Sequence, residues 1–311
     1  MLVHDFEPMS IGKILDRTFR IYKENFIRFV TIVAVIQVPI ALLVIISTSV
    51  LQRGVRVRQP IDYRQQVRNN RQNRENLGFD ERQRFFEEIR EDEHNPAIFI
   101  YGGIGMIIAG ILSMLGHLLC RGALTKSVSE SYLGNEITAG QAYRYVLPKF
   151  LSLIGAGFLV ALITYLGLLL LIVPGIIFAL WFALTTPAIV LENLKAVKGM
   201  SRSRILASGN LGKIFSIGFL VLLISWVISI PFSFVGGLMS NILFSNNIMI
   251  MTFVNQLFSL AGQILIVPIG AIAYILLYYD LRIRKEGFDL QMLANSIGSD
   301  QGEINVNQPP Q

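Results

Sequence analysis

The chain has 311 residues, of which 53% are hydrophobic and only 15% are charged, and its mean hydropathy is +0.55. Because an ordinary soluble protein carries about 25% charged residues, this composition excludes a soluble globular domain and indicates an integral membrane protein. The single cysteine, Cys120, excludes an intrachain disulfide. The net charge of +6 does not indicate nucleic-acid binding, since most charges flank apolar segments, where membrane topology accounts for them.

Six apolar stretches are long enough to cross about 30 Å of hydrocarbon as helices. They cover residues 29–51, 97–120, 150–172, 175–191, 214–235 and 252–279. The "VPG" at Val173–Gly175 predicts a tight turn between the third and fourth spans. We therefore expect an all-α fold, a polytopic membrane bundle of about six helices arranged as three hairpins. It forms a single membrane domain over residues 1–294, followed by a polar, disordered tail over residues 295–311.

Lysine and arginine residues gather on one side of these spans, before the first, between the second and third, between the fourth and fifth, and after the sixth. By the positive-inside rule, this distribution predicts a multi-pass protein of the cell membrane with both termini cytoplasmic. The polar loop over residues 52–95 must then lie on the opposite side, although it holds ten arginines beside nine acidic residues. It is either a solvated segment or a docking surface for a protein partner.

A short basic, amphipathic segment precedes each odd-numbered span. These segments begin at Ser10, Thr138 and Ala196. In the first segment, the apolar residues that share one helical face are Ile11, Leu15, Phe19 and Tyr22. The pattern predicts interfacial helices that present bases to membrane lipids with anionic head groups on the cytoplasmic face.

Gly105, Ala109 and Ser113 lie four residues apart in the second span, and such small residues allow two helices to approach closely. The stripe fits either packing within the chain or a dimer interface. His117, near the end of the same span, is either a functional ionisable group or a side chain that reaches the membrane interface.

The sixth span ends in a dense charge block, "YYDLRIRKEGFDL". If the helix continues, Asp280 pairs with Arg284 and Arg282 pairs with Glu286, because residues four apart are neighbours on a helix. The glycine that follows, Gly287, then ends the helix, and the two tyrosines that open the block fit an interfacial aromatic belt. The block therefore indicates a self-neutralising helix exit rather than a catalytic cluster.

Glu192 ends the fourth span, and we expect it to pair with an arginine across the cytoplasmic face. The candidates for contacts with lipid phosphate are Arg202, Arg204, Arg282 and Arg284. Their guanidinium forks match phosphate geometry. The alternative is that these arginines anchor helix ends and set the topology.

The sequence contains no recognisable constellation for catalysis, for a cofactor or for a metal. The three histidines, His4, His94 and His117, are scattered along the chain. The segment "GNLGKIF", which begins at Gly209, has a lysine but lacks the glycine spacing of a phosphate-binding loop. We therefore expect no catalytic residue, no cofactor and no metal site.

Several segments together carry a family resemblance. They are "LLLLIVPGIIFALWFALTTPAIVLEN" at Leu168–Asn193, "AVKGMSRSRILASGNLGKIF" just after it, "YYDLRIRKEGFDLQM" near the C-terminus, and the opening "PMSIGKILDRTFRIYKENF". The chain resembles the glycerophosphoryl diester phosphodiesterase membrane domain family, in which some members carry this domain before a catalytic barrel. Such a barrel needs about 250 residues and depends on a His-Arg dipeptide. Only about twenty residues follow "DLQML" in this sequence, and it contains no His-Arg pair. The resemblance thus implies a stand-alone membrane domain and not an enzyme.

Three functions are compatible with these observations. The first is a non-catalytic membrane protein that contacts lipid head groups or a membrane protein partner. The second is a permease-like subunit for a small or lipidic solute, which requires a polar cavity between spans. The third is an enzyme that acts on phospholipid, which requires a convergent acid, base or metal near the interface.

Overall fold

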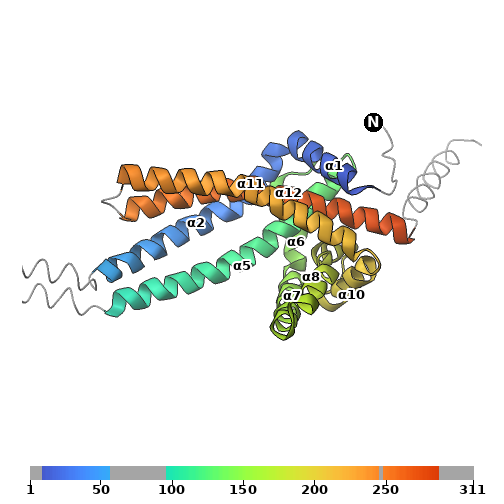
Figure 1. The fold of residues 1–311 in the computed structure, drawn as a ribbon, viewed down its shortest axis with the longest axis horizontal. Coiled ribbons are helices and arrows are strands. Elements are labelled where there is room, and N and C mark those ends of the chain that lie inside the picture. The colour runs from blue at the N-terminus through green and yellow to red at the C-terminus, as the bar shows by residue number, and fades with distance from the viewer. Residues whose placement is uncertain (1–8, 57–95, 245–247, 287–311) are drawn as a thin grey trace, which may run out of the picture. The chain divides into compact units, whose positions relative to one another are not determined.

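The computed structural model describes residues 9–56, 96–244 and 248–286, and within these ranges the chain is helical with no strand (Figure 1). The helices are α1 (Ile11–Glu24), α2 (Phe26–Arg56), α5 (Pro96–Tyr132), α6 (Ala139–Val146), α7 (Phe150–Leu170), α8 (Ile172–Trp181), α9 (Thr185–Glu192), α10 (Ala196–Ala207), α11 (Leu211–Phe244) and α12 (Ile248–Glu286). A short 3-10 turn, Leu147–Lys149, joins α6 to α7.

Six segments of the described chain are long and apolar enough to cross a membrane. They are Phe26–Val50, Ile100–Tyr132, Ala139–Leu170, Ile172–Glu192, Leu211–Phe244 and Ile250–Glu286. The predicted all-α polytopic bundle is confirmed. Most helices run past the predicted ends of their spans.

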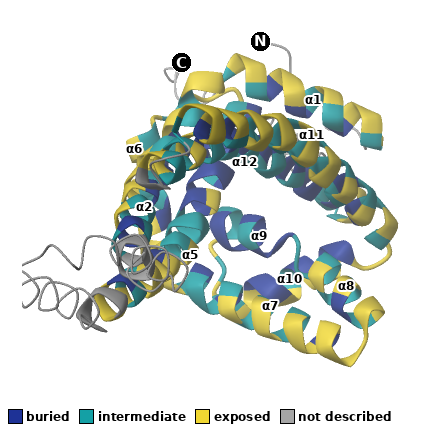
Figure 2. Ribbon diagram, turned by 60° about the vertical axis from the view of Figure 1, so that its left-hand side comes forward, coloured by how far each residue is buried: buried dark blue, intermediate teal, exposed yellow. Residues whose placement is uncertain are grey.

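The described chain divides into two compact units, where the sequence predicts one membrane domain. Unit 1 consists of Met1–Ile36, Leu115–Ile230 and Gly262–Gln311, and unit 2 consists of Gln37–Met114 and Pro231–Ala261. Helices α2, α5, α11 and α12 contribute residues to both units. The two hydrophobic core clusters belong to unit 1, and α9 in this unit is largely buried whereas the outer side of α1 is exposed (Figure 2).

The charged residues of the described chain are distributed unequally between the two units. Unit 1 contains seventeen lysines and arginines and seven acidic residues within the described ranges, whereas the described side chains of unit 2 carry none of these residue types. Unit 2 thus has the composition of a membrane-embedded segment, and the ionic chemistry of the described chain belongs to unit 1.

The predicted turn at Val173–Gly175 is wrong by a few residues. The chain turns at Leu171, whose extended backbone (φ −159°, ψ 145°) separates α7 from α8, and "VPG" lies in the first turns of α8. Proline suits this position because the first turn of a helix does not need its missing N–H. Helices α7 and α8 pack tightly, since a Cβ added at Gly175 would lie 2.7 Å from the backbone nitrogen of Leu168.

The fourth span is interrupted at Phe182–Leu184, between α8 and α9. Pro187 accounts for the break, since it cannot donate to the carbonyl of Ala183 and its ring crowds that carbonyl. The hydroxyl of Ser203 from α10 fills the gap, donating to Trp181 O at 2.7 Å and accepting from Leu184 N at 3.1 Å. Helices α7, α8 and α10 lie together as a result (Figure 1).

Helices occupy all three of the predicted amphipathic segments, as α1, α6 and α10. The buried face of α1 differs from the predicted one. Ile14, Thr18 and Ile21 are buried, whereas Phe19 is exposed. The buried stripe is displaced because α1 packs against the core of unit 1, where the Thr18 hydroxyl is satisfied by the carbonyl of Ile14 at 2.7 Å.

In unit 2, α5 packs on α2 within the chain. A Cβ at Gly105 would lie 2.7 Å from the hydroxyl oxygen of Ser47, Ala109 is buried and Ser113 is half-buried. Helix α11 similarly approaches α12, where a Cβ at Gly236 would lie 2.7 Å from Phe258 Cβ. These contacts and the α7–α8 packing pair the spans as three hairpins.

The Gly175 contact generates a first prediction. Replacing Gly175 by Ala inserts a methyl group against the backbone of Leu168 and should destabilise the protein by about 2 kcal/mol, as overpacking does elsewhere. The control is Gly110→Ala in α5, where an added Cβ meets no atom within 4 Å. Thermal unfolding in detergent should lower the midpoint for the first variant only, and equal midpoints would contradict this packing.

Candidate functional site at the charged end of α12

The last nine residues of α12, Tyr278–Glu286, form the most densely connected polar region among the residues that the structure describes. This segment includes the sequence block "YYDLRIRKE", and its side chains reach four other helices and the residues just before α1. We call it the α12 hub.

Asp280 lies at the centre of the hub, and its side chain is fully buried. Its carboxylate accepts hydrogen bonds from Met9 N at 2.6 Å, from Arg284 Nε at 3.1–3.2 Å, and from Lys213 Nζ. Both cations also donate to the carbonyl of Met9, Lys213 at 2.6 Å and Arg284 at 3.1 Å. The arrangement clamps the chain before α1 to α11 and α12.

A second ionic cluster joins the C-terminal ends of α9 and α12 to the middle of α10. Arg202 Nε donates to both oxygens of Glu192, at 2.8 and 3.0 Å, and its NH1 pairs with Glu286. Arg282 Nε lies 3.3 Å from Glu286 and 3.7 Å from Glu192, and the Tyr278 hydroxyl donates to Glu192. Two arginines therefore neutralise two carboxylates. The hydrogen bond with Glu286, aided by that with Glu192, raises the pKa of Arg202 above its ordinary value.

Glu192 owes its place to the way that α9 ends. The next residue, Asn193, adopts a left-handed conformation (φ 54°), which asparagine tolerates better than most residues, so the helix stops directly after the carboxylate. The expected partner of Glu192 is therefore Arg202, with Arg282 as a longer contact.

The two tyrosines of the hub are buried, so the predicted aromatic belt is wrong here. Tyr278 contacts Glu192, while the Tyr279 hydroxyl lies 2.6 Å from Ser129 Oγ and its ring stacks on Tyr132 at 5.1 Å. Their hydroxyl groups find partners inside the protein, which removes the reason for a tyrosine to sit at the membrane interface.

Lys285 caps α10. Its ammonium group donates to the carbonyls of Ile205 and Ser208, the latter at 2.7 Å, at the C-terminal end of that helix. A cation is favoured at this end, because unpaired carbonyls and the helix dipole make it negative. The hub therefore fixes α10 at two points, through Lys285 and through the Glu286–Arg202 pair.

The four arginines predicted to contact lipid phosphate fall into two kinds. Arg202 and Arg282 are engaged by carboxylates, with side chains only 21% and 18% exposed. Arg204 is exposed and lies over the ring of Trp181 at 4.6 Å. Arg284 is bound to Asp280, but 39% of its side chain is exposed.

The predicted i, i+4 neighbours of α12 are both in contact, since Arg284 touches Asp280 and Arg282 touches Glu286. Helix α12 ends at Glu286, and Gly287 and the tail lie outside the described residues, as do His4 and His94. His117 lies in α5 and is half-buried. Within the described ranges, no group of three or more His, Cys, Asp or Glu residues is placed to hold a metal ion.

Comparison with known proteins gives this architecture a family. A family model described as a domain of unknown function, DUF7847, matches residues 96–281, more than half of the chain. The chain belongs to the DUF7847 family. The matched region holds Glu192, Arg202, Lys213 and Asp280, whereas Met9 and the hub residues after Leu281 lie outside it.

A curated relative is also a membrane protein. The chain is similar to the UPF0259 membrane protein SG1383 of Sodalis glossinidius (strain morsitans), with 36% identity over 107 residues. The match covers 33% of this chain and 42% of that relative, less than half of its length. No solved structure matches. The resemblance to the glycerophosphoryl diester phosphodiesterase membrane domain family gains no support from these matches and stays a hypothesis.

Sequence reasoning missed Met9, Ser129 and Ser203 as parts of this DUF7847 protein's polar framework, and it treated Lys213 only as a topology signal. The serines and Met9 have no local pattern that marks them. The lysine of "GNLGKIF" was visible as one of few bases beside an apolar span, but no local pattern pairs it with Asp280, which lies 67 residues later.

The second ionic cluster generates a prediction. Glu192→Gln keeps the shape of the side chain but removes the charge that faces Arg202 and Arg282, so we expect a loss of about 2–3 kcal/mol of stability. Glu136→Gln is the control, because that carboxylate is 84% exposed and forms a surface pair with Arg28, which is worth under about 1 kcal/mol. Unfolding in detergent monitored by tryptophan fluorescence measures both. Unaltered folding and expression of Glu192→Gln would count against a structural role.

Proposed function

We propose that this membrane protein is non-catalytic and that the basic surface of unit 1 binds the anionic head groups of membrane lipids. The observation that carries the proposal is the unequal exposure of its charges. Acidic residues of unit 1 are largely engaged by partners inside the protein, while many bases remain on the surface.

The burial and pairing of the acidic side chains support this proposal. Asp280 is fully buried, Glu192 and Glu286 are engaged by two arginines, and Glu130 pairs with Lys126. The exposed acidic side chains in the described part of unit 1 are Asp16, Glu24 and Glu136. The exposed basic ones are Lys13, Arg20, Lys23, Arg121, Arg144, Lys195, Lys198, Arg204, Arg284 and Lys285. Each base near an anionic membrane surface contributes about 1 kcal/mol to its attraction.

The exposures also refine which arginines we propose as phosphate contacts. Arg204 keeps this role, since its side chain is exposed, and Arg284 keeps it only through the 39% of its side chain that stays exposed while it pairs with Asp280. Arg202 and Arg282 are better assigned to structure, because a phosphate would have to compete with Glu192 and Glu286 for them. Arg204 is joined by Lys195 and Lys198, exposed at the start of α10.

We further propose the cell membrane as the location, with both termini and the basic residues that flank the spans on the cytoplasmic side. Support comes from the positive-inside rule, since the described bases gather in unit 1. A protein partner for the loop over residues 52–95 remains a proposal from sequence, because residues 57–95 lie outside the described ranges.

A permease-like role is the alternative, and the interrupted fourth span is the feature that would favour it, because broken helices form binding sites in transporters. Here the freed backbone groups of Trp181 and Leu184 are satisfied by Ser203, which is itself fully buried. The break is therefore accounted for by packing, and lipid contact is the function that we favour over transport or phospholipid chemistry.

The lipid proposal predicts the behaviour of a triple variant, Lys195→Gln with Lys198→Gln and Arg204→Gln. In detergent micelles, the wild-type protein should retain phosphatidylglycerol in preference to phosphatidylcholine, and the variant should lose at least tenfold of this preference. Native mass spectrometry measures the bound lipid, and added salt should weaken the preference because these charges are exposed.

The control for this experiment is Ser201→Ala on α10, an exposed polar residue without charge. Its phosphatidylglycerol binding should match that of the wild type. If the wild-type protein retains both lipids equally, or if the triple variant binds phosphatidylglycerol as well as the wild type does, the proposal is wrong.

A further inference from the structure

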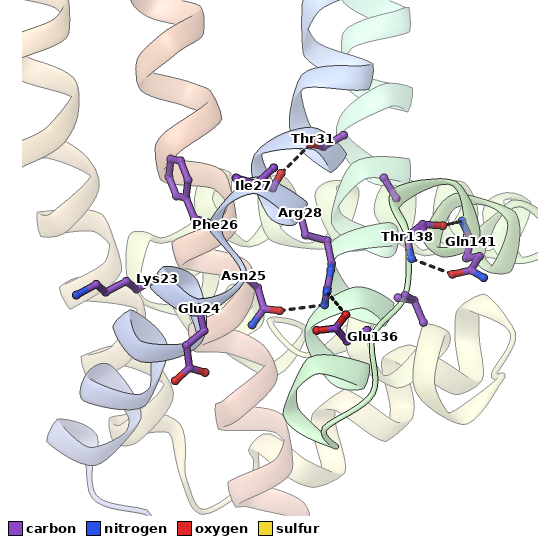
Figure 3. Close-up of a pocket in the computed structure, with 12 residues that line it drawn as sticks. Lys23, Glu24, Asn25, Phe26, Ile27, Arg28, Thr31, Glu136, Thr138 and Gln141 are labelled. Carbon is purple, nitrogen blue, oxygen red and sulfur yellow. Dashed lines mark hydrogen bonds and ion pairs between the residues drawn. The ribbon is translucent and has the colours of Figure 1, made fainter. Parts of the chain in front are cut away.

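A groove of about 830 Å³ opens where α1 meets α2, opposite the segment that leads into α6. Its walls are residues 23–28 and Thr31 on one side, and residues 136–139 and Gln141 on the other. This volume lies in the range of small-ligand sites in proteins. Figure 3 shows Arg28 reaching from α2 toward Asn25 and Glu136, with Thr138 and Gln141 on the far wall.

Arg28 is the preorganised cation of this groove. Its NH1 group lies 2.9 Å from Asn25 Oδ1 and 3.4 Å from Ser131 Oγ, and its NH2 group lies 3.2 Å from Glu136 Oε2. The side chain is 21% exposed, so the guanidinium group is held in place yet accessible. A guanidinium group has five N–H donors, and those not used by these contacts are suited to a phosphate oxygen.

The groove also carries carboxylates, which distinguishes it from the basic surface of unit 1. Glu136 and Glu24 both line it, and the Glu136 side chain is 84% exposed. With Lys23 and Arg28, the lining contains two bases and two acids, so its formal charge is zero. A purely anionic head group would meet repulsion from these acids, whereas a head group with a phosphate and an ammonium group would find a partner for each.

The position of the groove points to a lipid. The first apolar span of the chain begins at Phe26, so Arg28 lies in the first turn of that span, at the depth where lipid phosphates lie. Phe26 and Ile27 are exposed beside the groove, Ile27 by 79%, and they offer an apolar path for acyl chains. The start of α6 is not a free anion site, because Thr138 and Gln141 cap each other there.

We infer that this groove binds the head group of an aminophospholipid, with the phosphate on Arg28 and the primary ammonium group on Glu136. This inference rests on the proposed lipid function and names one lipid class at one site. A primary ammonium group donates hydrogen bonds to carboxylates, whereas the quaternary ammonium of phosphatidylcholine has no N–H group to donate. The groove should therefore distinguish the two lipids.

The test uses the full-length protein in detergent micelles, with phosphatidylethanolamine, phosphatidylcholine or phosphatidylglycerol added, and counts bound lipid by native mass spectrometry. We expect about fivefold tighter binding of phosphatidylethanolamine than of phosphatidylcholine at one site, the difference that one exposed ion pair provides. Glu136→Gln should remove this preference, and Asp16→Asn, an exposed acid of α1 outside the groove, should keep it. Arg28→Gln should weaken both lipids, and Arg28→Lys should restore part of the binding.

Other outcomes overturn the inference. Equal binding of phosphatidylethanolamine and phosphatidylcholine contradicts it, and so does a Glu136→Gln variant that binds phosphatidylglycerol more tightly without any change in the phosphatidylethanolamine preference. The second result would make Glu136 an internal competitor for Arg28. Displacement of the lipid by equimolar soluble phosphoethanolamine would assign the groove to a free head group instead.

Failure of the groove is distinguishable from failure of the wider lipid proposal. If phosphatidylglycerol retention still depends on Lys195, Lys198 and Arg204 while the phosphatidylethanolamine preference is absent, only the groove assignment falls. If neither lipid is retained in preference to phosphatidylcholine, both proposals fall.

Discussion

The buried carboxylate of Asp280 is the constraint on which the rest of unit 1 depends. A carboxylate without solvent costs several kcal/mol unless it is paired and fully hydrogen-bonded. Its donors come from three places in the chain, the backbone of Met9, Lys213 at the start of α11, and Arg284 one turn further along α12. Satisfying one charge therefore fixes the chain before α1 against two long helices.

These ionic clusters determine which charges remain exposed on the surface of unit 1. The hub engages Asp280, Glu192 and Glu286 in contacts within the protein, so the exposed surface of unit 1 is strongly basic. This excess of exposed bases is the basis of the proposed contact with anionic lipid. The groove beside Arg28 is the exception, since its exposed acids balance its bases. Two surfaces of different charge thus lie in the same unit, and we propose that each favours a different head group.

Local periodicity in the sequence made part of the fold and of the α12 hub predictable. Long apolar runs identify spanning helices, and neighbours four residues apart on α12 identify the contacts of Asp280 with Arg284 and of Arg282 with Glu286. Contacts between distant segments were not predictable, because Lys213 lies 67 residues before Asp280 and Met9 lies 271 residues before Asp280. The predicted aromatic belt at Tyr278 and Tyr279 was wrong for the same reason, since the partners of these tyrosines, among them Ser129, lie on other helices.

The most direct test of this account is a double-mutant cycle between Asp280 and Lys213, measured by reversible unfolding in detergent. Asp280→Asn removes the charge that faces both Lys213 and Arg284 and should cost about 3–5 kcal/mol, whereas Lys213→Met leaves Asp280 paired with Arg284 and should cost less. The double variant should cost clearly less than the sum of the two, because it strands neither partner. An Asp280→Asn protein as stable as the wild type, or strictly additive costs, would contradict the claim that this ion pair organises unit 1.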